Sequence, residues 1–177
     1  MESTSPLIQE SSPVEPAGPE PTCQVIHPEA ELSANFAGLT RRLACQYSID
    51  KGVLVVRDRE SSELSAISTW RDGIVHDGLR LNLPSEDSLF EKVAEDGRVY
   101  TEDFCESFSG NFFERKLLLE NESRCFVVQP LLFEGRVRGL LGYSSRRPST
   151  FAMFADGALD EIAERFGELI DSTLDPR

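Results

Sequence analysis

Positive charge is scarce in this chain of 177 residues. Lys and Arg number 18 against 31 Asp and Glu, which gives a formal net charge of −13, and there are only two histidines. Surfaces that bind nucleic acid or anionic membranes need clustered positive charge. We therefore expect neither as a partner. The length suits one domain of ordinary size with a tail and is too short for two separate cores.

Long apolar runs and a secretory start are also absent. The longest useful run, Cys125–Phe133, has nine residues and contains Gln129, whereas a membrane-spanning helix needs about 20 predominantly apolar residues. The first residues, Met1–Ser5, lack the basic start and the apolar stretch of a secretory signal. We therefore expect a cytoplasmic protein.

Cysteine is sparse and shows no motif. Cys23, Cys45, Cys105 and Cys125 form no C-x-x-C pair, and neither histidine is placed to complete a zinc site. Reduced thiols are the favoured interpretation. The sequence also lacks the G-x-S-x-G, H-E-x-x-H, P-loop and G-x-G-x-x-G motifs. We expect no metal site and no catalytic residue, and nothing in the sequence requires a cofactor.

Proline is concentrated at the N-terminus. Six of the ten prolines lie in the first 28 residues, together with Glu2, Glu10, Glu15 and Glu20 and no Lys or Arg. Such a segment cannot bury enough apolar surface to offset the entropy lost on ordering. Residues 1–27 are therefore predicted to be a disordered tail, either a spacer or a docking segment, and residues 28–177 the folded domain.

Apolar spacing predicts a helix at each end of the domain. Pro28 suits a first helical position, and apolar residues then recur every three or four positions up to Tyr47. The same spacing predicts a long helix from Phe151 to about Leu174. The apolar face of the first helix comprises Leu32, Phe36, Leu39, Leu43 and Tyr47. That of the last comprises Phe151, Phe154, Ala158, Ile162, Phe166 and Leu169.

Two hairpins are predicted between these helices. Residues 53–56 and 63–70 are separated by a short polar connection, and residues 124–133 and 136–145 are joined by Glu134-Gly135. The first of these strands is rich in β-branched residues, and the others alternate or run apolar. Short connections of this kind favour antiparallel pairing.

A short helix and two minor strands complete the pattern. Ser85 is predicted as the N-cap of the helix and Gly97 as the residue that ends it. Minor strands are predicted at 79–83 and 98–101. Strands in hairpins with helices at both ends indicate an α+β fold. We expect a central antiparallel sheet of five or six strands with helices on its faces and the N- and C-terminal helices packed together.

The order of these elements and several local stretches resemble a GAF domain, a ligand-binding sensory module common in bacterial signalling proteins. The strongest likeness is Val127–Leu141, a strand ending in Pro-Leu, a Gly turn and a second strand that contains Gly. The other stretches are Gly52–Asp58, Leu64–Trp70 and Ser88–Tyr100. The resemblance covers about residues 28–174. It implies a module that binds a small molecule and signals through a partner protein.

Specific ligands of the resembling family can be checked against these residues. Its cyclic-nucleotide-binding members carry an Asn-Lys…Phe…Asp-Glu signature, and this sequence has no Asn-Lys pair. Its bilin-binding members attach the pigment through a Cys with a neighbouring His, whereas Cys105 stands between Phe104 and Glu106. The resemblance therefore favours a module whose small molecule is of another, unknown kind.

The enzymatic branch of the family reduces free methionine sulfoxide with cysteines around its pocket. Cys105 and Cys125 are the only suitable pair, because the other two lie in the tail and in the first helix. The chemistry needs a low-pKa attacking thiolate. The acidic side chains of Glu102, Asp103 and Glu106 would instead raise the pKa of Cys105. We expect a non-catalytic protein, with the reductase as the weaker alternative.

Four of the eleven phenylalanines lie within residues 104–113. Phe104, Phe108 and Phe112 are spaced by four, which predicts one apolar helical face packed on the sheet. The small and polar residues between them favour turns instead. In the resembling family this connection covers the ligand pocket, so an aromatic lid is the second hypothesis. The implied pocket comprises Trp70, Asp103, Phe104, Phe108, Phe113 and Gln129.

The terminal helices allow two arrangements. Members of the resembling family often pair such helices between copies, which implies a homodimer; alternatively, both helices cover one sheet face of a single chain. The residues implied in the dimer are Leu32, Phe36, Leu39, Leu43, Phe154, Ile162 and Phe166. Two functions follow. One is a small-molecule sensor that controls a signalling partner, and the other is a ligand-free dimerisation or interaction scaffold that kept the fold.

Overall fold

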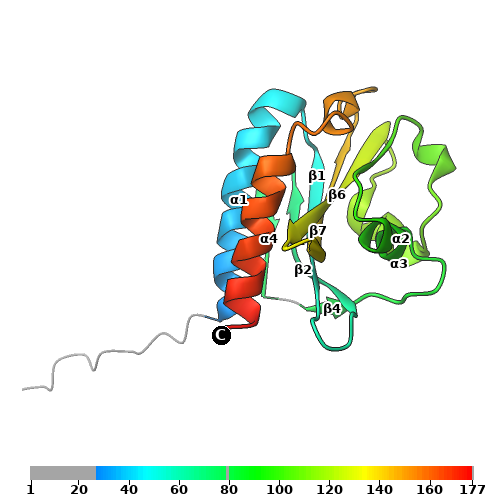
Figure 1. The fold of residues 1–177 in the computed structure, drawn as a ribbon. Helices are drawn as coiled ribbons and strands as arrows, with labels where there is room; N and C mark the ends of the chain where they lie inside the picture. Colours follow the sequence, from blue (N-terminus) through cyan, green and yellow to red (C-terminus); the bar gives the residue numbers. More distant parts are fainter. Residues whose placement is uncertain (1–26, 79, 177) are drawn as a thin grey trace, which may run out of the picture.

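The structure, a computed structural model, describes residues 27–78 and 80–176 (Figure 1). The predicted tail, apart from His27, lies outside the described residues. Helices α1 (Pro28–Tyr47) and α4 (Asp160–Leu174) lie side by side on one face of a central sheet. Helices α2 (Leu89–Asp96) and α3 (Phe112–Leu118) cover the other face. Within the described ranges, no helix is long and apolar enough to cross a membrane.

An antiparallel sheet of seven strands forms the middle layer. The strand order is β3-β2-β1-β7-β6-β5, and β4 pairs with β2 beside this path. The strands are β1 (Lys51–Arg57), β2 (Leu64–Arg71), β3 (Ile74–His76), β4 (Leu81–Asn82), β5 (Tyr100–Glu102), β6 (Cys125–Phe133) and β7 (Arg136–Ser145). The α+β prediction, with packed terminal helices, is therefore confirmed. The sheet has more strands than the five or six expected.

The hairpin that adds β3 is not among the predicted strands. Its two-residue turn, Asp72-Gly73, takes positive φ at both positions, 46° and 90°. This is the geometry of the type I′ turn, for which Asp-Gly is a preferred sequence. The minor strand predicted at 79–83 is reduced to β4, two residues that pair with Ser65 and Ala66 of β2. Leu79 lies outside the described residues.

Both faces of the central strands are buried, which explains their nearly continuous apolar sequences. In β1, Leu54 and Val56 belong to the apolar cluster under α1 and α4, whereas Val53 and Val55 belong to the cluster under α2 and α3. Strand β6 alternates in the same way. Since successive side chains of a strand point to opposite faces, one run of residues supplies both clusters.

Helix α2 begins later than the sequence predicts. Its N-cap is Ser88, whose hydroxyl accepts a hydrogen bond from Glu91 N at 3.0 Å, so the prediction of Ser85 as the cap is wrong. Asp87 has a φ of 50°, which a right-handed helix cannot contain. Gly97 ends the helix at a φ of 63°, as predicted.

Helix α4 begins at Asp160, so the prediction of one helix from Phe151 is wrong. Residues Ala152–Phe154 form a short 3-10 helix, η2, and Gly157 then takes a φ of 86°. Glycine adopts this left-handed conformation easily, and it interrupts the helix. Phe151 and Phe154 are nevertheless buried in the same apolar cluster as α4. The spacing therefore identifies core residues correctly across a break in the helix.

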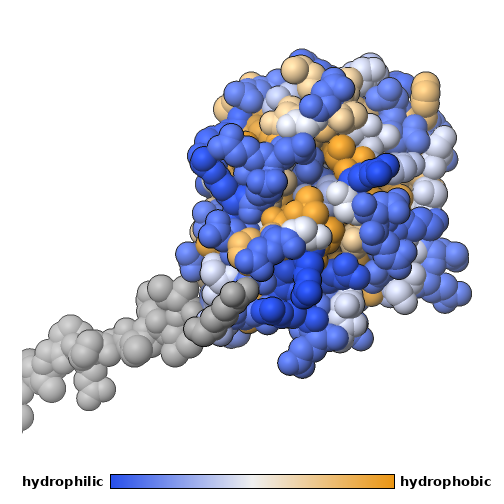
Figure 2. All heavy atoms as spheres, viewed as in Figure 1, coloured by the Kyte–Doolittle hydropathy of each residue, from blue (hydrophilic) through white to orange (hydrophobic). Residues whose placement is uncertain are grey.

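The apolar faces of α1 and α4 are occupied within the single chain. Of the seven residues implied in a dimer, Ile162 is half-buried and the other six are buried in the cluster against the sheet. Those six are Leu32, Phe36, Leu39, Leu43, Phe154 and Phe166. The surface over α1 and α4 is mostly hydrophilic (Figure 2). These side chains therefore cover one sheet face, and a homodimer through other residues stays a prediction.

A buried hydrogen bond joins α1 to the middle of the sheet. The hydroxyls of Thr40, on α1, and Tyr143, on β7, lie 2.9 Å apart, and both residues are fully buried. Burial raises the pKa of the Tyr143 phenol, which therefore stays neutral. The ring of Tyr143 also stacks on Phe36, with 6.3 Å between the centroids.

Removing one hydroxyl of this pair should lower the free energy of unfolding, and removing the second as well should add little to that loss. Thr40→Val leaves the Tyr143 hydroxyl buried without a partner, so we expect the free energy of unfolding to fall by about 1–3 kcal/mol in urea titrations. Tyr143→Phe leaves the Thr40 hydroxyl in the same position. The double variant should lose clearly less than the sum of the two single losses. Additive losses would show that the two hydroxyls are not coupled.

Candidate functional site

The residues of the predicted ligand pocket do not meet in one cavity. Trp70, on β2, is buried in the cluster under α1 and α4, and Arg41 lies 5.8 Å from its ring centre. Phe108 packs against Phe126, on the opposite face of the sheet, with 5.3 Å between the centroids. Gln129 is buried near the edge strand β5 and lines a surface hollow on the α4 side. The sheet therefore separates Trp70 from Phe108.

The other three pocket residues lie at the surface. Asp103 is exposed, and Phe104 and Phe113 expose 67% and 45% of their side chains. Phe112, the third residue of the predicted helical face, exposes 66%. Only Phe108 of the four phenylalanines is turned inward, where it is half-buried. The prediction of one apolar helical face on the sheet is therefore wrong for this segment.

The backbone of the segment explains this outcome. A short 3-10 helix, η1 (Cys105–Ser107), is followed by an extended stretch, and α3 then begins with Asn111 as its N-cap. Asn111 and Glu114 form a capping box, in which the Asn111 side chain accepts from Glu114 N at 3.1 Å. The helical periodicity of Phe104, Phe108 and Phe112 is thus interrupted before α3 starts.

Glu114 closes the space between α2 and α3. It is fully buried, and its carboxylate accepts hydrogen bonds from Leu89 N at 2.9 Å and Phe90 N at 3.1 Å. The Ser88 hydroxyl also donates to it, as does Asn111 N at 3.3 Å. The carboxylate therefore satisfies the free N–H groups at the start of α2, where the helix dipole favours negative charge. An anionic ligand would find these donors already occupied.

The interior under α2 and α3 is filled by the chain itself. Sixteen buried residues, with Leu118 and Phe126 among them, form one apolar cluster there. Packing is tight under α3, since a Cβ atom added to Gly142 would lie 2.9 Å from side-chain atoms of Leu118 and Val53. Two features of the sequence point to the helix starts in this layer: the Asn-x-x-Glu spacing of the capping box at Asn111 and the N-cap residue Ser88. Neither signal shows that Glu114 would reach α2.

The two candidate thiols lie on opposite faces of the sheet. Cys105 belongs to the cluster under α2 and α3, and Cys125 to the cluster under α1 and α4. Burial raises the pKa of the Cys105 thiol to about 11, and the nearby Cys125 and Glu106 add to the effect. The Cys125 thiol donates to the carbonyl oxygen of Arg147 at 3.0 Å. Among the described residues, no three side chains are grouped to hold a metal ion.

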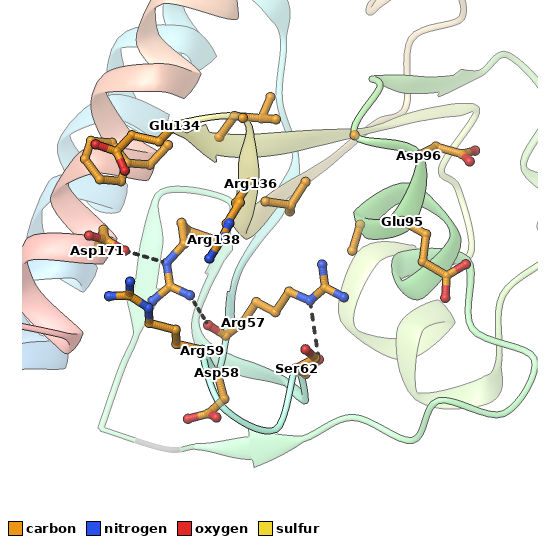
Figure 3. Close-up of a pocket in the computed structure, with 16 residues that line it drawn as sticks. Arg57, Asp58, Arg59, Ser62, Glu95, Asp96, Glu134, Arg136, Arg138 and Asp171 are labelled. Carbon is orange, nitrogen blue, oxygen red and sulfur yellow. Dashed lines mark hydrogen bonds and ion pairs between the residues drawn. The ribbon is translucent and has the colours of Figure 1, made fainter.

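A hollow of about 820 Å³ opens at the end of the sheet where β1 ends and β7 begins (Figure 3). Four arginines line it, at positions 57, 59, 136 and 138. Its other walls come from the end of α2, the turn between β6 and β7, and Asp171 of α4. None of these residues belongs to the predicted pocket, and no sequence motif marks the four arginines as a group.

Comparison with solved structures supports the GAF-like fold. The GAF domain of a two-component sensor histidine kinase from Bacillus halodurans matches at 14% identity with a TM-score of 0.63, covering 81% of this chain and 97% of that one. A type II free methionine-R-sulfoxide reductase from Thermoplasma acidophilum matches at 13% identity with a TM-score of 0.61, covering 82% and 96%. The GAF domain of a phosphoenolpyruvate-protein phosphotransferase from Coxiella burnetii matches at 18% identity with a TM-score of 0.60, covering 83% and 84%.

Comparison of the sequence with protein families and with curated proteins gives no match. No protein-family model matches the chain, and no curated protein does. At identities below a fifth, the structural matches speak for the fold alone. The predicted resemblance to GAF domains is therefore confirmed as a shared fold, which sensors and reductases both use.

Replacing Glu114 should loosen both α2 and α3. Glu114→Gln keeps the size of the side chain but offers one acceptor oxygen in place of two, and its amide donors face the N–H groups of α2. We expect the free energy of unfolding to fall by about 2–4 kcal/mol, because buried donors lose a charged acceptor. Hydrogen exchange should speed up at residues 88–91. Glu106→Gln, at an exposed position of η1, is the control and should leave both measurements unchanged.

Proposed function

We propose that this chain is a non-catalytic regulatory module with a GAF-like fold that acts by pairing with a second copy of itself. The observation that carries the proposal is the arrangement of residues 104–118. This segment is closed on its inner side by Glu114 and turns three of its four phenylalanines outward. A lid over a ligand would present its aromatic side chains to the interior instead.

The filled interior favours the scaffold over an internal sensor. Glu114 occupies the donors at the start of α2, and the apolar cluster under α3 leaves little room beside Gly142. A ligand in this position would have to displace a carboxylate that accepts several hydrogen bonds in a buried site. Such bonds to a charged group are among the stronger ones in proteins. These contacts support a module that keeps the fold and has the Glu114 carboxylate where an internal ligand would lie.

The cysteines favour a non-catalytic role. The reductase chemistry needs an attacking thiolate and a resolving thiol within reach of it. Cys105 and Cys125 belong to different apolar clusters, and burial raises the pKa of Cys105, which keeps its thiolate scarce at neutral pH. These observations support the non-catalytic module, and the likeness to the reductases supports only a shared fold.

The surface beside α3 suits contact with a second copy. The rings of Phe112 and Phe113 touch at 5.9 Å between centroids, and both are exposed. Next to Phe112 lies a groove lined by Glu106, Arg115 and Lys116. In a two-fold interface each patch meets its own copy, so acidic and basic groups side by side can pair across the axis. Exposed aromatic residues are enriched at such contacts.

Changing the exposed ring pair should weaken the proposed dimer without unfolding the chain. Phe112→Ser with Phe113→Ser removes the apolar centre of the contact, so we expect the dissociation constant to rise at least about tenfold in sedimentation equilibrium. Ile74→Ser, another exposed apolar residue on β3, is the matched control and should leave it unchanged. A chain that is monomeric at high micromolar concentration would contradict the pairing.

Cys105 should behave as an inert thiol. Because burial raises its pKa to about 11, peptide-resolved alkylation should be slow at pH 8 and accelerate as the pH approaches 11. Exposed Cys45 serves as the internal reference. With a thiol reductant, the chain should reduce free methionine sulfoxide no faster than Cys105→Ser does. Turnover that this substitution abolishes would establish the reductase in place of the non-catalytic module.

A further inference from the structure

Two short Arg-x-Arg segments meet at one end of the sheet. Arg57-Asp58-Arg59 lies where β1 ends, and Arg136-Val137-Arg138 lies where β7 begins. The antiparallel register pairs Val56 with Gly139, so these two strand ends are neighbours. The topology thus collects four arginines around one hollow, although the sequence places the two pairs about 80 residues apart.

Among the residues that the structure describes, two of the four arginines, Arg59 and Arg136, have no charged partner there. Within the described ranges, Arg59 and Arg136 form no ion pair or hydrogen bond, and Arg57 donates only to the Ser62 carbonyl oxygen at 3.4 Å. Arg138 differs, since it is buried and pairs with Asp171 at 3.0 Å and with Asp175. Figure 3 shows the side chains of Arg136 and Arg138 close together, with Arg57 reaching toward α2.

Five carboxylates line the hollow, at positions 58, 95, 96, 134 and 171, and in Figure 3 that of Glu134 lies on the α4 side. Asp58 accepts hydrogen bonds from the backbone N–H and the hydroxyl of Ser61 and from Glu60 N, which lowers the pKa of its carboxyl and holds it in the turn. The side chains of Glu95 and Asp96 point away from the arginines in Figure 3. Like charges held together repel one another unless an anion lies between them.

We propose that this arginine hollow binds a small organic anion that carries at least two phosphate or carboxylate groups. The anionic groups would be bound by Arg57, Arg59 and Arg136. Arg138 is held by Asp171 and Asp175 and lines the hollow beside them. This site lies outside the interior closed by Glu114, and the proposal does not depend on self-association of the chain.

The shape and chemistry of the hollow suit such a ligand. Its volume of about 820 Å³ is within the range of pockets for small molecules. Guanidinium groups bind phosphate and carboxylate through two parallel hydrogen bonds, which rewards ligands with several anionic groups. The apolar residues Ala94, Leu132 and Val137 in its lining can contact the carbon skeleton of a ligand.

Calorimetric titration of the full chain at low ionic strength tests the site. The probes are inorganic pyrophosphate and citrate, which separate a preference for phosphate from one for carboxylate. We expect at least one of them to bind with one-to-one stoichiometry. In Arg59→Gln with Arg136→Gln, the affinity should fall at least about tenfold, because two of the charged donors are removed. Both positions are exposed, so the fold should be retained.

Arg42→Gln is the matched control, because Arg42 is exposed on α1 and does not line the hollow. It removes one positive charge from the same acidic chain and should leave the affinity within about twofold of the parent, because screened surface charges act weakly at a distance. Absence of binding by both probes would overturn the proposal. Equal affinity in the parent and in the double arginine variant would overturn it as well, since the anion would then bind elsewhere.

Discussion

The pairing of β1 with β7 is the contact on which the rest of the structure depends. These two strands lie at the centre of the sheet, and both of their faces are buried. Glycines on β7 allow other layers to approach closely. A Cβ atom at Gly139 would lie 2.9 Å from a side-chain atom of Ile170 on α4, and one at Gly142 would lie 2.9 Å from a side-chain atom of Leu118 on α3. Helix α4 can therefore pack against one face of β7, and α3 against the other.

This central pair also separates the chain's chemical groups. Side chains that alternate along β6 reach opposite layers, so Cys125 belongs to the cluster under α1 and α4, whereas Cys105, on η1, belongs to the cluster under α2 and α3. The layer under α3 is completed by Glu114, which occupies the backbone donors at the start of α2. Groups that can still meet a ligand or a partner are then those at the ends of the strands and on the outside of α3.

The spacing of apolar residues predicted which side chains are buried better than it predicted where helices begin and end. Phe151 and Phe154 are core residues as their spacing indicates, yet Gly157 separates them from α4. The phenylalanines of residues 104–113 failed as a helical face because the capping box at Asn111 starts a new helix. Glu114 could not be recognised at all, since its partners Leu89 and Phe90 lie about 25 residues away and periodicity reports only near neighbours.

The net charge of −13 describes the whole chain and does not give the local electrostatic potential at one part of the surface. Four arginines gather at one strand end only because β1 and β7 are antiparallel neighbours, a fact of topology that composition cannot express. Acidic groups elsewhere repel an extended polyanion at long range, whereas a small anion inside the hollow contacts the guanidinium groups directly. We therefore expect an acidic protein with the proposed site to disfavour nucleic acid and still to bind a compact anion in the hollow.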